Sequence, residues 1–384
     1  MDGKAERNKR ILKRLITYAL IAALVFCAIV IGVQFKAFTN SNNSTQNLYS
    51  KGYYYSRLSE DEKKAYDAVC NNIHDMPQKL LLPATADIDS VNKVIEAFRA
   101  DNCFTELLAA DKISFVDSFL GNYLTISYTM TQEEYRKLED ELNRKIDSII
   151  SNMPRCRNDF EKELYLHDYI VKNTQYEINK KPLSNTAYGA LVENKSACVG
   201  YAQAMKMLLN KADIQCITVC GEADDGKRSE NHMWNQVKLS GQWYNLDPTW
   251  DDAVGETPTL THKFFNLTDS ELKKTHTPYV SVNECTASAD NYFVEMGLLF
   301  DSYDEQCKNK IFEEIARASV SEPAEIRFSS KDEYKRACKK LIEQDIFLGK
   351  DKIEAISSKQ IDIENTGIIR CDNLCIIEFK VSYK

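Results

Sequence analysis

The spacing of apolar residues along the chain predicts helices and strands separated by polar turns. Residues 15–33 form a nearly unbroken apolar run that is long enough to cross a bilayer as a helix. Residues 36–50 are rich in Asn, Ser and Thr, which is typical of a solvated linker. We therefore expect one membrane-spanning helix, a tether and then folded domains.

Residues 51–151 are predicted to form an accessory domain of helices with a strand pair around residues 113–127. One helix is predicted to open at Thr131, because Glu134 completes a capping-box pattern. No residue pattern in this region indicates chemistry, so we interpret it as a packing or recognition domain. Its last helix keeps apolar residues at helical spacing: Tyr135, Leu138, Leu142, Ile146 and Ile149.

A second domain is expected over residues 152–284, beginning with a helix near Arg157. The apolar stripe of this helix is Phe160, Leu164, His167 and Val171, so we interpret His167 as a core histidine. His74, His262 and His276 have no nucleophile-like neighbour in the sequence.

Residues 285–384 alternate helical patterns with strand-like runs, which predicts a small α+β domain. The helical patterns cover residues 304–319 and 331–344, and the strand-like runs cover residues 324–329 and 374–383.

Cys198 lies in a segment that suits a reactive thiol. If Ser196 is the N-cap of the following apolar run, Cys198 falls in the first helical turn. The free backbone N–H groups and the positive end of the helix dipole favour the thiolate there. The same N–H groups would stabilise the oxyanion of a tetrahedral intermediate. Most free cysteines are small buried hydrophobes, so the partners of Cys198 decide its interpretation.

His232 and Asp247 are predicted to lie on one face of a β-hairpin. Residues 231–239 and 242–247 have strand patterns, and Ser-Gly at 240–241 is a tight-turn signal. A turn centred there makes paired positions sum to 481, so His232 and Asp247 are diagonal neighbours. Such neighbours have Cα atoms about 7–8 Å apart, and a slip of one residue would separate them onto opposite faces. This parity suits a general base and its orienting carboxylate.

The three residues are more informative together than singly. In isolation His232 suits a strand end, and Asp247 suits a turn before Pro248. Neither explanation accounts for contexts typical of a nucleophile, a base and an orienting carboxylate within the 50 residues from Cys198 to Asp247. We predict a Cys-His-Asp catalytic triad.

The chain resembles the transglutaminase-like superfamily over about a third of its length, roughly residues 152–280. The matching segments are 189–191, 198–202, 231–235 and 243–252. The flanking regions look similar to those of bacterial membrane-anchored members of the group.

This resemblance implies an α+β, papain-like core in which the nucleophile helix packs on an antiparallel sheet. It implies that Cys198 is the nucleophile, that His232 is the general base and then the general acid, and that Asp247 fixes the imidazole tautomer. It implies no cofactor and no metal. Two departures from the family pattern are Met233, which narrows the cleft where many relatives have a small residue, and Asp213, which replaces a glycine at the helix end.

The three tryptophans of the chain fall within 17 residues of this hairpin. Trp234, Trp250 and Tyr201 are candidates to wall an acyl-binding cleft, although most tryptophans in strands belong to a core. Residues 251–252, both Asp, suit a turn or contact with a cationic substrate group.

The predicted chemistry is acyl transfer through a thioester. A protein or peptide amide is the expected substrate, and an amine or water is the acceptor. A transglutaminase-type acyltransferase or deamidase, a cysteine protease or cell-wall peptide hydrolase, and a non-catalytic surface binding module all stay open.

The basic residues before the apolar run predict where the protein lies. Six Lys or Arg side chains in residues 1–14 predict a cytoplasmic tail, with residues 15–35 as a signal anchor and an extracellular remainder. A cleavable signal peptide is the alternative, but no small-x-small site is evident before residue 36. We expect a single-pass protein of the cell membrane that acts on a protein or peptide at the cell surface.

Charge and cysteine content narrow the partners. Residues 37–384 hold 42 basic and 55 acidic residues, which argues against nucleic-acid binding and favours basic substrates. Eleven cysteines follow the predicted anchor, and export permits disulfides without fixing any pair. Cys371 and Cys375 have no histidine nearby in the sequence, so no zinc site is expected there.

Overall fold

The computed structural model describes residues 49–177, 183–252, 259–341 and 349–384. The predicted cytoplasmic tail, the signal anchor and nearly all of the linker lie outside the described residues. Among the helices that are described, none combines the length and the apolar character needed to cross a membrane.

The chain divides into two compact units, and the first contains residues 58–95 and 110–128. Its antiparallel sheet has the strand order β1-β3-β2, which confirms the strand pair predicted around residues 113–127. A capping box between Ser59 and Glu62 starts its first helix. The elements are α2 (Glu60–Asn72), η2 (Ile73–Asp75), β1 (Lys79–Leu81), the start of α3 (Ile88–Asp101), β2 (Ala110–Val116) and β3 (Tyr123–Tyr128).

The second unit contains residues 52–57, 96–109 and 129–384. Its first part is a helical layer against an antiparallel sheet with the order β8-β7-β6-β9. The elements are η1 (Tyr55–Arg57), η3 (Glu106–Ala109), α4 (Gln132–Ser151), α5 (Asp159–Asn173), β4 (Gln175–Tyr176), α6 (Ala187–Leu191), β5 (Lys195–Ser196), α7 (Cys198–Lys211), β6 (Cys216–Asp224), β7 (Ser229–Leu239), β8 (Gln242–Leu246), α8 (Pro248–Asp251), α9 (Asp269–Leu272) and β9 (His276–Pro278).

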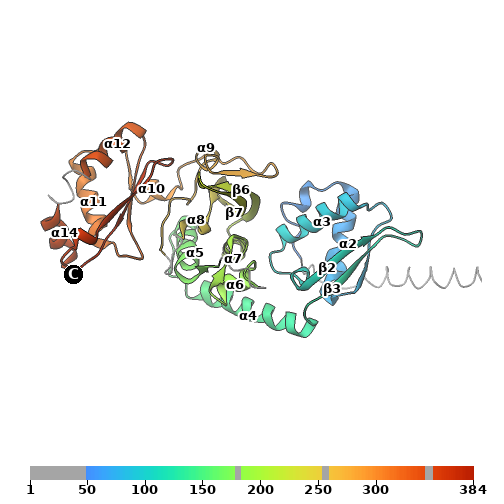
Figure 1. The fold of residues 1–384 in the computed structure, drawn as a ribbon. Helices are drawn as coiled ribbons and strands as arrows, with labels where there is room; N and C mark the ends of the chain where they lie inside the picture. Colours follow the sequence, from blue (N-terminus) through green and yellow to red (C-terminus); the bar gives the residue numbers. More distant parts are fainter. Residues whose placement is uncertain (1–48, 178–182, 253–258, 342–348) are drawn as a thin grey trace, which may run out of the picture. The chain divides into compact units, whose positions relative to one another are not determined.

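Helix α7 packs directly on β6 and β7, with α4, α5 and α6 around it (Figure 1). The shared core contains side chains from all of these helices, including Ile146, Leu166 and Met205, together with Val237 and Tyr244 of the sheet. The predicted arrangement of a nucleophile helix on an antiparallel sheet is therefore present.

Helix α4 begins at the predicted capping box between Thr131 and Glu134. Four of its five predicted apolar positions are buried, and Leu138 is partly buried. We placed this helix in the accessory domain, but its apolar face belongs to the core that contains α7.

Helix α5 begins after Asn158, whose side chain accepts a hydrogen bond from the Glu161 N–H. The buried face of α5 differs from the predicted stripe. Leu164 is only partly buried, and several residues outside the stripe are buried. The buried residues are Phe160, Glu163, Leu166, His167, Ile170 and Val171.

The β7–β8 hairpin has the predicted register. Ser240 and Gly241 both have positive φ, at 49° and 83°, as the tight two-residue turn requires. Pairs run from Leu239↔Gln242 to Asn235↔Leu246, so every pair keeps the predicted sum. The ladder stops at Leu246, one residue short of the predicted strand end.

Helix α7 ends at Ala212 in a Schellman motif even though the family glycine is absent. Asp213 adopts φ 64°, and the N–H of Ile214 donates to the carbonyl oxygen of Leu209 at 2.9 Å. An aspartate tolerates this left-handed conformation better than most residues. The helix end therefore keeps its left-handed cap without the glycine that the family pattern has there.

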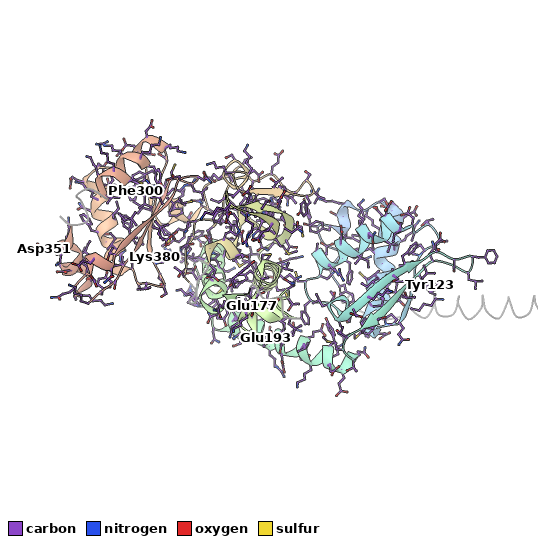
Figure 2. The ribbon with its side chains drawn as sticks, viewed as in Figure 1. Tyr123, Glu177, Glu193, Phe300, Asp351 and Lys380 are labelled. Carbon is purple, nitrogen blue, oxygen red and sulfur yellow. The ribbon has the colours of Figure 1, made fainter. Side chains whose placement is uncertain are left out.

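The remainder of the second unit is the predicted α+β region. Its sheet has the order β10-β11-β13-β12, and Phe300 on β10 and Lys380 on β13 are labelled in Figure 2. The elements are α10 (Tyr292–Glu295), β10 (Leu299–Phe300), α11 (Glu305–Arg317), β11 (Ala324–Phe328), α12 (Lys331–Lys340), α14 (Lys350–Ser357), η5 (Ile363–Asn365), β12 (Gly367–Cys371) and β13 (Ile376–Lys380).

Candidate active site

Cys198 is the first residue of α7, as predicted, but Ala197 is the N-cap instead of Ser196. The Ser196 hydroxyl donates to the carbonyl oxygen of Ser184 at 2.7 Å, and Ser196 pairs in β5. The helix start therefore has no side-chain cap, and the half-buried Cys198 is its first residue. Such an end stabilises an anion.

His232 joins the other two predicted residues. Its Nε2 lies 2.7 Å from Oδ2 of Asp247, and the Cys198 thiol is near enough to contribute to the raised pKa of His232. Because Nε2 faces the carboxylate, Nδ1 is the nitrogen available to the sulfur. The fold therefore brings Cys198, His232 and Asp247 together in the order that nucleophile, base and orienting carboxylate require.

Asp247 is held where β8 ends and α8 begins. It is the N-cap of α8, and its Oδ1 accepts hydrogen bonds from the N–H groups of Thr249 and Trp250. Pro248 occupies the first helical position, where a missing N–H costs nothing. With Oδ1 bound by backbone, Oδ2 is directed at His232.

A second histidine, His276, shares this oxygen and was missed in the sequence. Its Nε2 lies 3.1 Å from Oδ2 of Asp247, and its Nδ1 lies 2.8 Å from the Thr275 hydroxyl. His276 begins β9, which pairs with β6 through Ala223↔His276. The flanking threonines favour a strand, but no local signal identifies its partner strand.

Burial and charge set the protonation of the dyad. Burial by itself would lower the pKa of His232, but the Asp247 carboxylate and the hydrogen bond with Cys198 raise it to about 10. Burial would raise the pKa of Asp247, but His232 and His276 hold it well below its usual range. The Asp247 carboxylate therefore favours the protonated form of His232.

The candidate substrate-binding residues differ in exposure. Trp234 is 1% exposed and Tyr201 0% exposed, so in this structure neither side chain offers a surface to a substrate. Trp234 instead stacks near His232, with ring centroids 6.4 Å apart. The Tyr201 hydroxyl lies 2.6 Å from Oδ2 of Asp252 inside the core.

Trp250 is the partly exposed member of the three candidates. Its ring centroid lies 4.5 Å from that of His276 and 6.0 Å from that of His232. Trp250 also borders a cavity of about 260 Å³ together with Phe264 and Lys263. This position is compatible with a substrate contact beside the dyad.

The two aspartates after Trp250 are both buried, so a direct role with a cationic substrate does not fit them. Asp251 accepts a hydrogen bond from the N–H of Phe264 at 2.9 Å and contacts His167. Burial raises the pKa of Asp252 to about 6. Both carboxylates organise the segment that follows α8.

Two groups of side chains have the types and spacing of a metal site. One is His232, Asp247 and His276, and the other is His167, Asp168 and His262. The cysteines among the described residues are all free thiols, including Cys216, Cys220, Cys371 and Cys375.

Residues 147–248 match the family model of the transglutaminase-like superfamily, a range that includes Cys198, His232 and Asp247. The kyphoscoliosis peptidase of Homo sapiens is 25% identical over 170 residues, which are 39% of this chain and 25% of that protein. The kyphoscoliosis peptidase of Mus musculus is 24% identical over 147 residues, 33% of this chain and 22% of that protein. The chain thus spans about a quarter of the length of these relatives.

Solved structures give weak similarities. A TGase crystal structure matches with a TM-score of 0.27 and 14% identity, covering 46% of this chain and 52% of that one. A putative cysteine protease from Cytophaga hutchinsonii matches with a TM-score of 0.27 and 11% identity, covering 47% and 68%. Residues 147–248 of this chain are therefore the part that is similar to the transglutaminase-like superfamily.

Proposed function

We propose that this protein is a Cys-His-Asp enzyme that forms a thioester from a protein or peptide amide and passes the acyl group to water or an amine. The observation that carries the proposal is the imidazole of His232, which lies 2.7 Å from the Asp247 carboxylate and interacts electrostatically with Cys198 at the start of α7. A thiol beside an imidazole that a carboxylate orients is the arrangement that nucleophilic cysteine catalysis needs.

In the first half of the reaction the thiol proton of Cys198 passes to Nδ1 of His232, and the sulfur attacks the carbonyl carbon of the amide. The backbone N–H groups at the start of α7 stabilise the oxyanion. As the C–N bond breaks, His232 gives its Nδ1 proton to the leaving amine. Asp247 keeps the proton on Nε2 throughout and so fixes the tautomer.

In the second half an acceptor attacks the thioester. His232 takes a proton from water or an amine, the C–S bond breaks and the Cys198 thiolate is regenerated. Water yields hydrolysis or deamidation, and a lysine amine yields a cross-link. The printed name of the human and mouse relatives supports a peptidase and therefore water as acceptor.

The reactivity of Cys198 separates an enzyme from a non-catalytic binding module. We expect iodoacetamide at pH 7 to alkylate Cys198 first, measured by peptide mapping over time. Cys220 is an internal control. Its side chain is exposed, but desolvation of the thiol by neighbouring protein atoms raises its pKa to about 11. Equal rates at the two cysteines, or an unchanged rate at Cys198 in His232→Ala, would contradict the proposal.

The acceptor is identified by product masses. Glutamine-containing peptides are incubated with the protein, with and without a primary amine, beside a Cys198→Ser control. Cleaved peptides indicate a peptidase, a deamidation shift indicates side-chain hydrolysis, and amine addition indicates a transglutaminase. None of these products above the Cys198→Ser background, across peptides of varied sequence, would contradict acyl transfer.

We propose in addition that residues 15–35 anchor the protein with its catalytic domain outside the cell. The apolar run and its basic flank support this placement. The full chain is expected in the membrane fraction, and protease added to intact cells is expected to remove the catalytic domain. A chain that stays in the soluble fraction would overturn this placement.

A further inference from the structure

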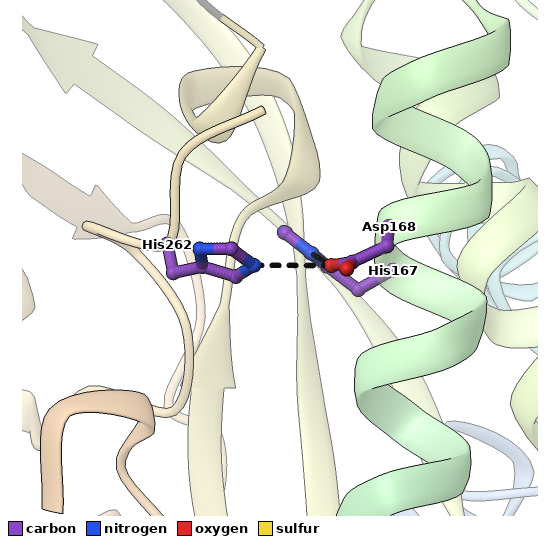
Figure 3. A group of neighbouring side chains, drawn as sticks. All are labelled: His167, Asp168 and His262. Atoms are coloured by element: carbon purple, nitrogen blue, oxygen red, sulfur yellow. Dashed lines mark hydrogen bonds and ion pairs between the residues drawn. The ribbon is translucent and has the colours of Figure 1, made fainter. Parts of the chain in front are cut away.

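A second group of titratable side chains lies apart from the triad, where α5 meets the segment at residues 259–265. His167 and Asp168 are neighbours on α5, and His262 reaches them from the other segment (Figure 3). Nδ1 of His167 and Nε2 of His262 each lie 3.1 Å from the same atom, Oδ1 of Asp168. Two imidazole nitrogens and one carboxylate oxygen therefore converge.

The other nitrogen of each ring is held by a different carboxylate. Nε2 of His167 lies 3.2 Å from Oδ2 of Asp251, and Nδ1 of His262 lies 3.2 Å from Oε2 of Glu325. Such outer carboxylates fix the tautomer of a metal-binding histidine and orient its lone pair toward the ion. His262 is further fixed by Tyr292, whose ring is stacked on it with centroids 3.8 Å apart.

We propose that His167, Asp168 and His262 bind one divalent transition-metal ion of the zinc class. The ligands are Nδ1 of His167, Oδ1 of Asp168 and Nε2 of His262. Two nitrogens and a carboxylate oxygen suit Zn²⁺ or Co²⁺ and disfavour Ca²⁺, which prefers oxygen ligands alone. The Asp168 side chain is 25% exposed, which provides an entry path and leaves a position for water.

The charges around the site are consistent with a dication. Three carboxylates, Asp168, Asp251 and Glu325, surround two imidazoles, and Asp251 and Glu325 are buried. A divalent ion replaces one proton on each ring nitrogen that faces Asp168, so its binding releases up to two protons and preserves the net charge.

The outer shell distinguishes this site from the triad. In the group His232, Asp247 and His276, the second nitrogen of one ring faces the Cys198 thiol and that of the other faces a hydroxyl. Only the group on α5 has a carboxylate behind both rings, among the residues that the structure describes. We therefore assign the metal to the α5 group.

The ion would join three parts of the second unit. His167 and Asp168 belong to α5, His262 follows α8, and Glu325 lies on β11 of the C-terminal sheet. The His262 backbone N–H also donates to Glu325 at 2.8 Å. Metal binding is thus expected to raise the thermal midpoint of unfolding, because the ion binds the native arrangement only.

The test is a titration of the full chain in detergent, after chelation and dialysis, with Zn²⁺ by calorimetry and Co²⁺ by absorbance. A Cys198→Ser background removes the catalytic thiol as a ligand, so the result is independent of the proposed function. We expect one ion per chain, visible Co²⁺ bands without intense thiolate charge transfer, and a higher thermal midpoint. No binding at micromolar metal would overturn the proposal.

Variants locate the ion. His262→Gln is expected to abolish metal binding at micromolar concentrations. Glu325→Gln changes only the carboxylate behind the His262 ring and is expected to weaken the metal affinity about 10- to 100-fold. His276→Gln is the matched control and is expected to bind normally. Loss of binding in His276→Gln with retention in His262→Gln would place the ion at the triad and overturn the assignment. If His262→Gln does not fold by circular dichroism, Glu325→Gln decides the result.

Discussion

At the scale of single residues, the site depends on one carboxylate oxygen. Oδ2 of Asp247 accepts from two imidazoles, and Oδ1 accepts from two backbone N–H groups, so the carboxylate has no rotational freedom. A buried anion with four donors keeps its charge, and that charge holds His232 as an imidazolium. Asp247 therefore influences the reactivity of Cys198 through His232.

Asp247→Asn is expected to lower kcat/KM about 10³- to 10⁴-fold, because the amide favours the wrong imidazole tautomer. The pKa of His232, raised to about 10 in the intact protein, should also fall. Since the acid form of His232 protonates the leaving group, the alkaline limb of the pH–rate profile should move to lower pH. Asp89→Asn, at an exposed position of α3, is the control and should leave the profile unchanged.

His276 is a positioning residue, because it acts through Asp247. His276→Leu removes one hydrogen bond to the carboxylate and is expected to lower kcat about tenfold, corresponding to roughly 1.4 kcal/mol. His276→Gln keeps a donor and should restore most of kcat, with little change in KM for either variant. Equal loss in both variants, with normal folding, would argue against this role.

At the scale of elements, the hairpin and the edge strand β9 build the site together. β6 lies between β7 and β9, and Gly221 pairs with His232 on one side and Pro278 on the other. A β-carbon at Gly221 would collide with the Trp234 ring and the Thr277 carbonyl oxygen. Glycine therefore allows the sheet and the aromatic layer to approach closely behind the dyad.

Gly221→Ala is expected to lower the free energy of unfolding by about 1–3 kcal/mol and to reduce kcat, because overpacking displaces Trp234 and β9. Urea denaturation measures the first effect and steady-state kinetics the second. Gly226→Ala has open space for its β-carbon but a φ of 84°, so it tests backbone strain without overpacking. A loss of activity in Gly226→Ala equal to that in Gly221→Ala would contradict the packing explanation.

At the scale of the whole molecule, the core of the second unit contains a buried titratable group beyond the site. Glu163 on α5 is 0% exposed and accepts a hydrogen bond from Asn266 at 2.8 Å. Burial raises the pKa of Glu163 to about 8, although the Asn266 hydrogen bond opposes the shift. The folded protein therefore prefers the neutral acid, and the unfolded chain ionises near the ordinary value of 4.5.

Because the folded pKa lies above the unfolded one, the stabilising contribution of Glu163 is complete below pH 4.5 and is lost as pH rises to about 8. Glu163→Gln should make the free energy of unfolding less dependent on pH between 5 and 8, by up to about 1.4 kcal/mol per pH unit. Urea melts across this range measure it. The exposed Glu193→Gln is the control and should keep the wild-type slope.

Two features of the candidate site were predictable from the residues alone, the helix start at Cys198 and the hairpin that holds His232 and Asp247, because each is local. Cys198 at a helix start follows from the residues around it, and the shared face of His232 and Asp247 follows from the two-residue period of strands and the Ser240–Gly241 turn. The N-cap was misassigned by one residue, because the Ser196 hydroxyl bonds Ser184 from a distant turn.

Which distant residues join these local units depends on contacts between elements that are far apart in the chain. His276 reaches Asp247 because β9 pairs with β6, and His262 reaches Asp168 across 94 positions. The burial of Trp234 and Tyr201 likewise depends on packing between layers. The entropy cost of closing a long loop varies only slowly with the number of residues in it. The separation of two residues along the chain therefore says little about whether they are in contact.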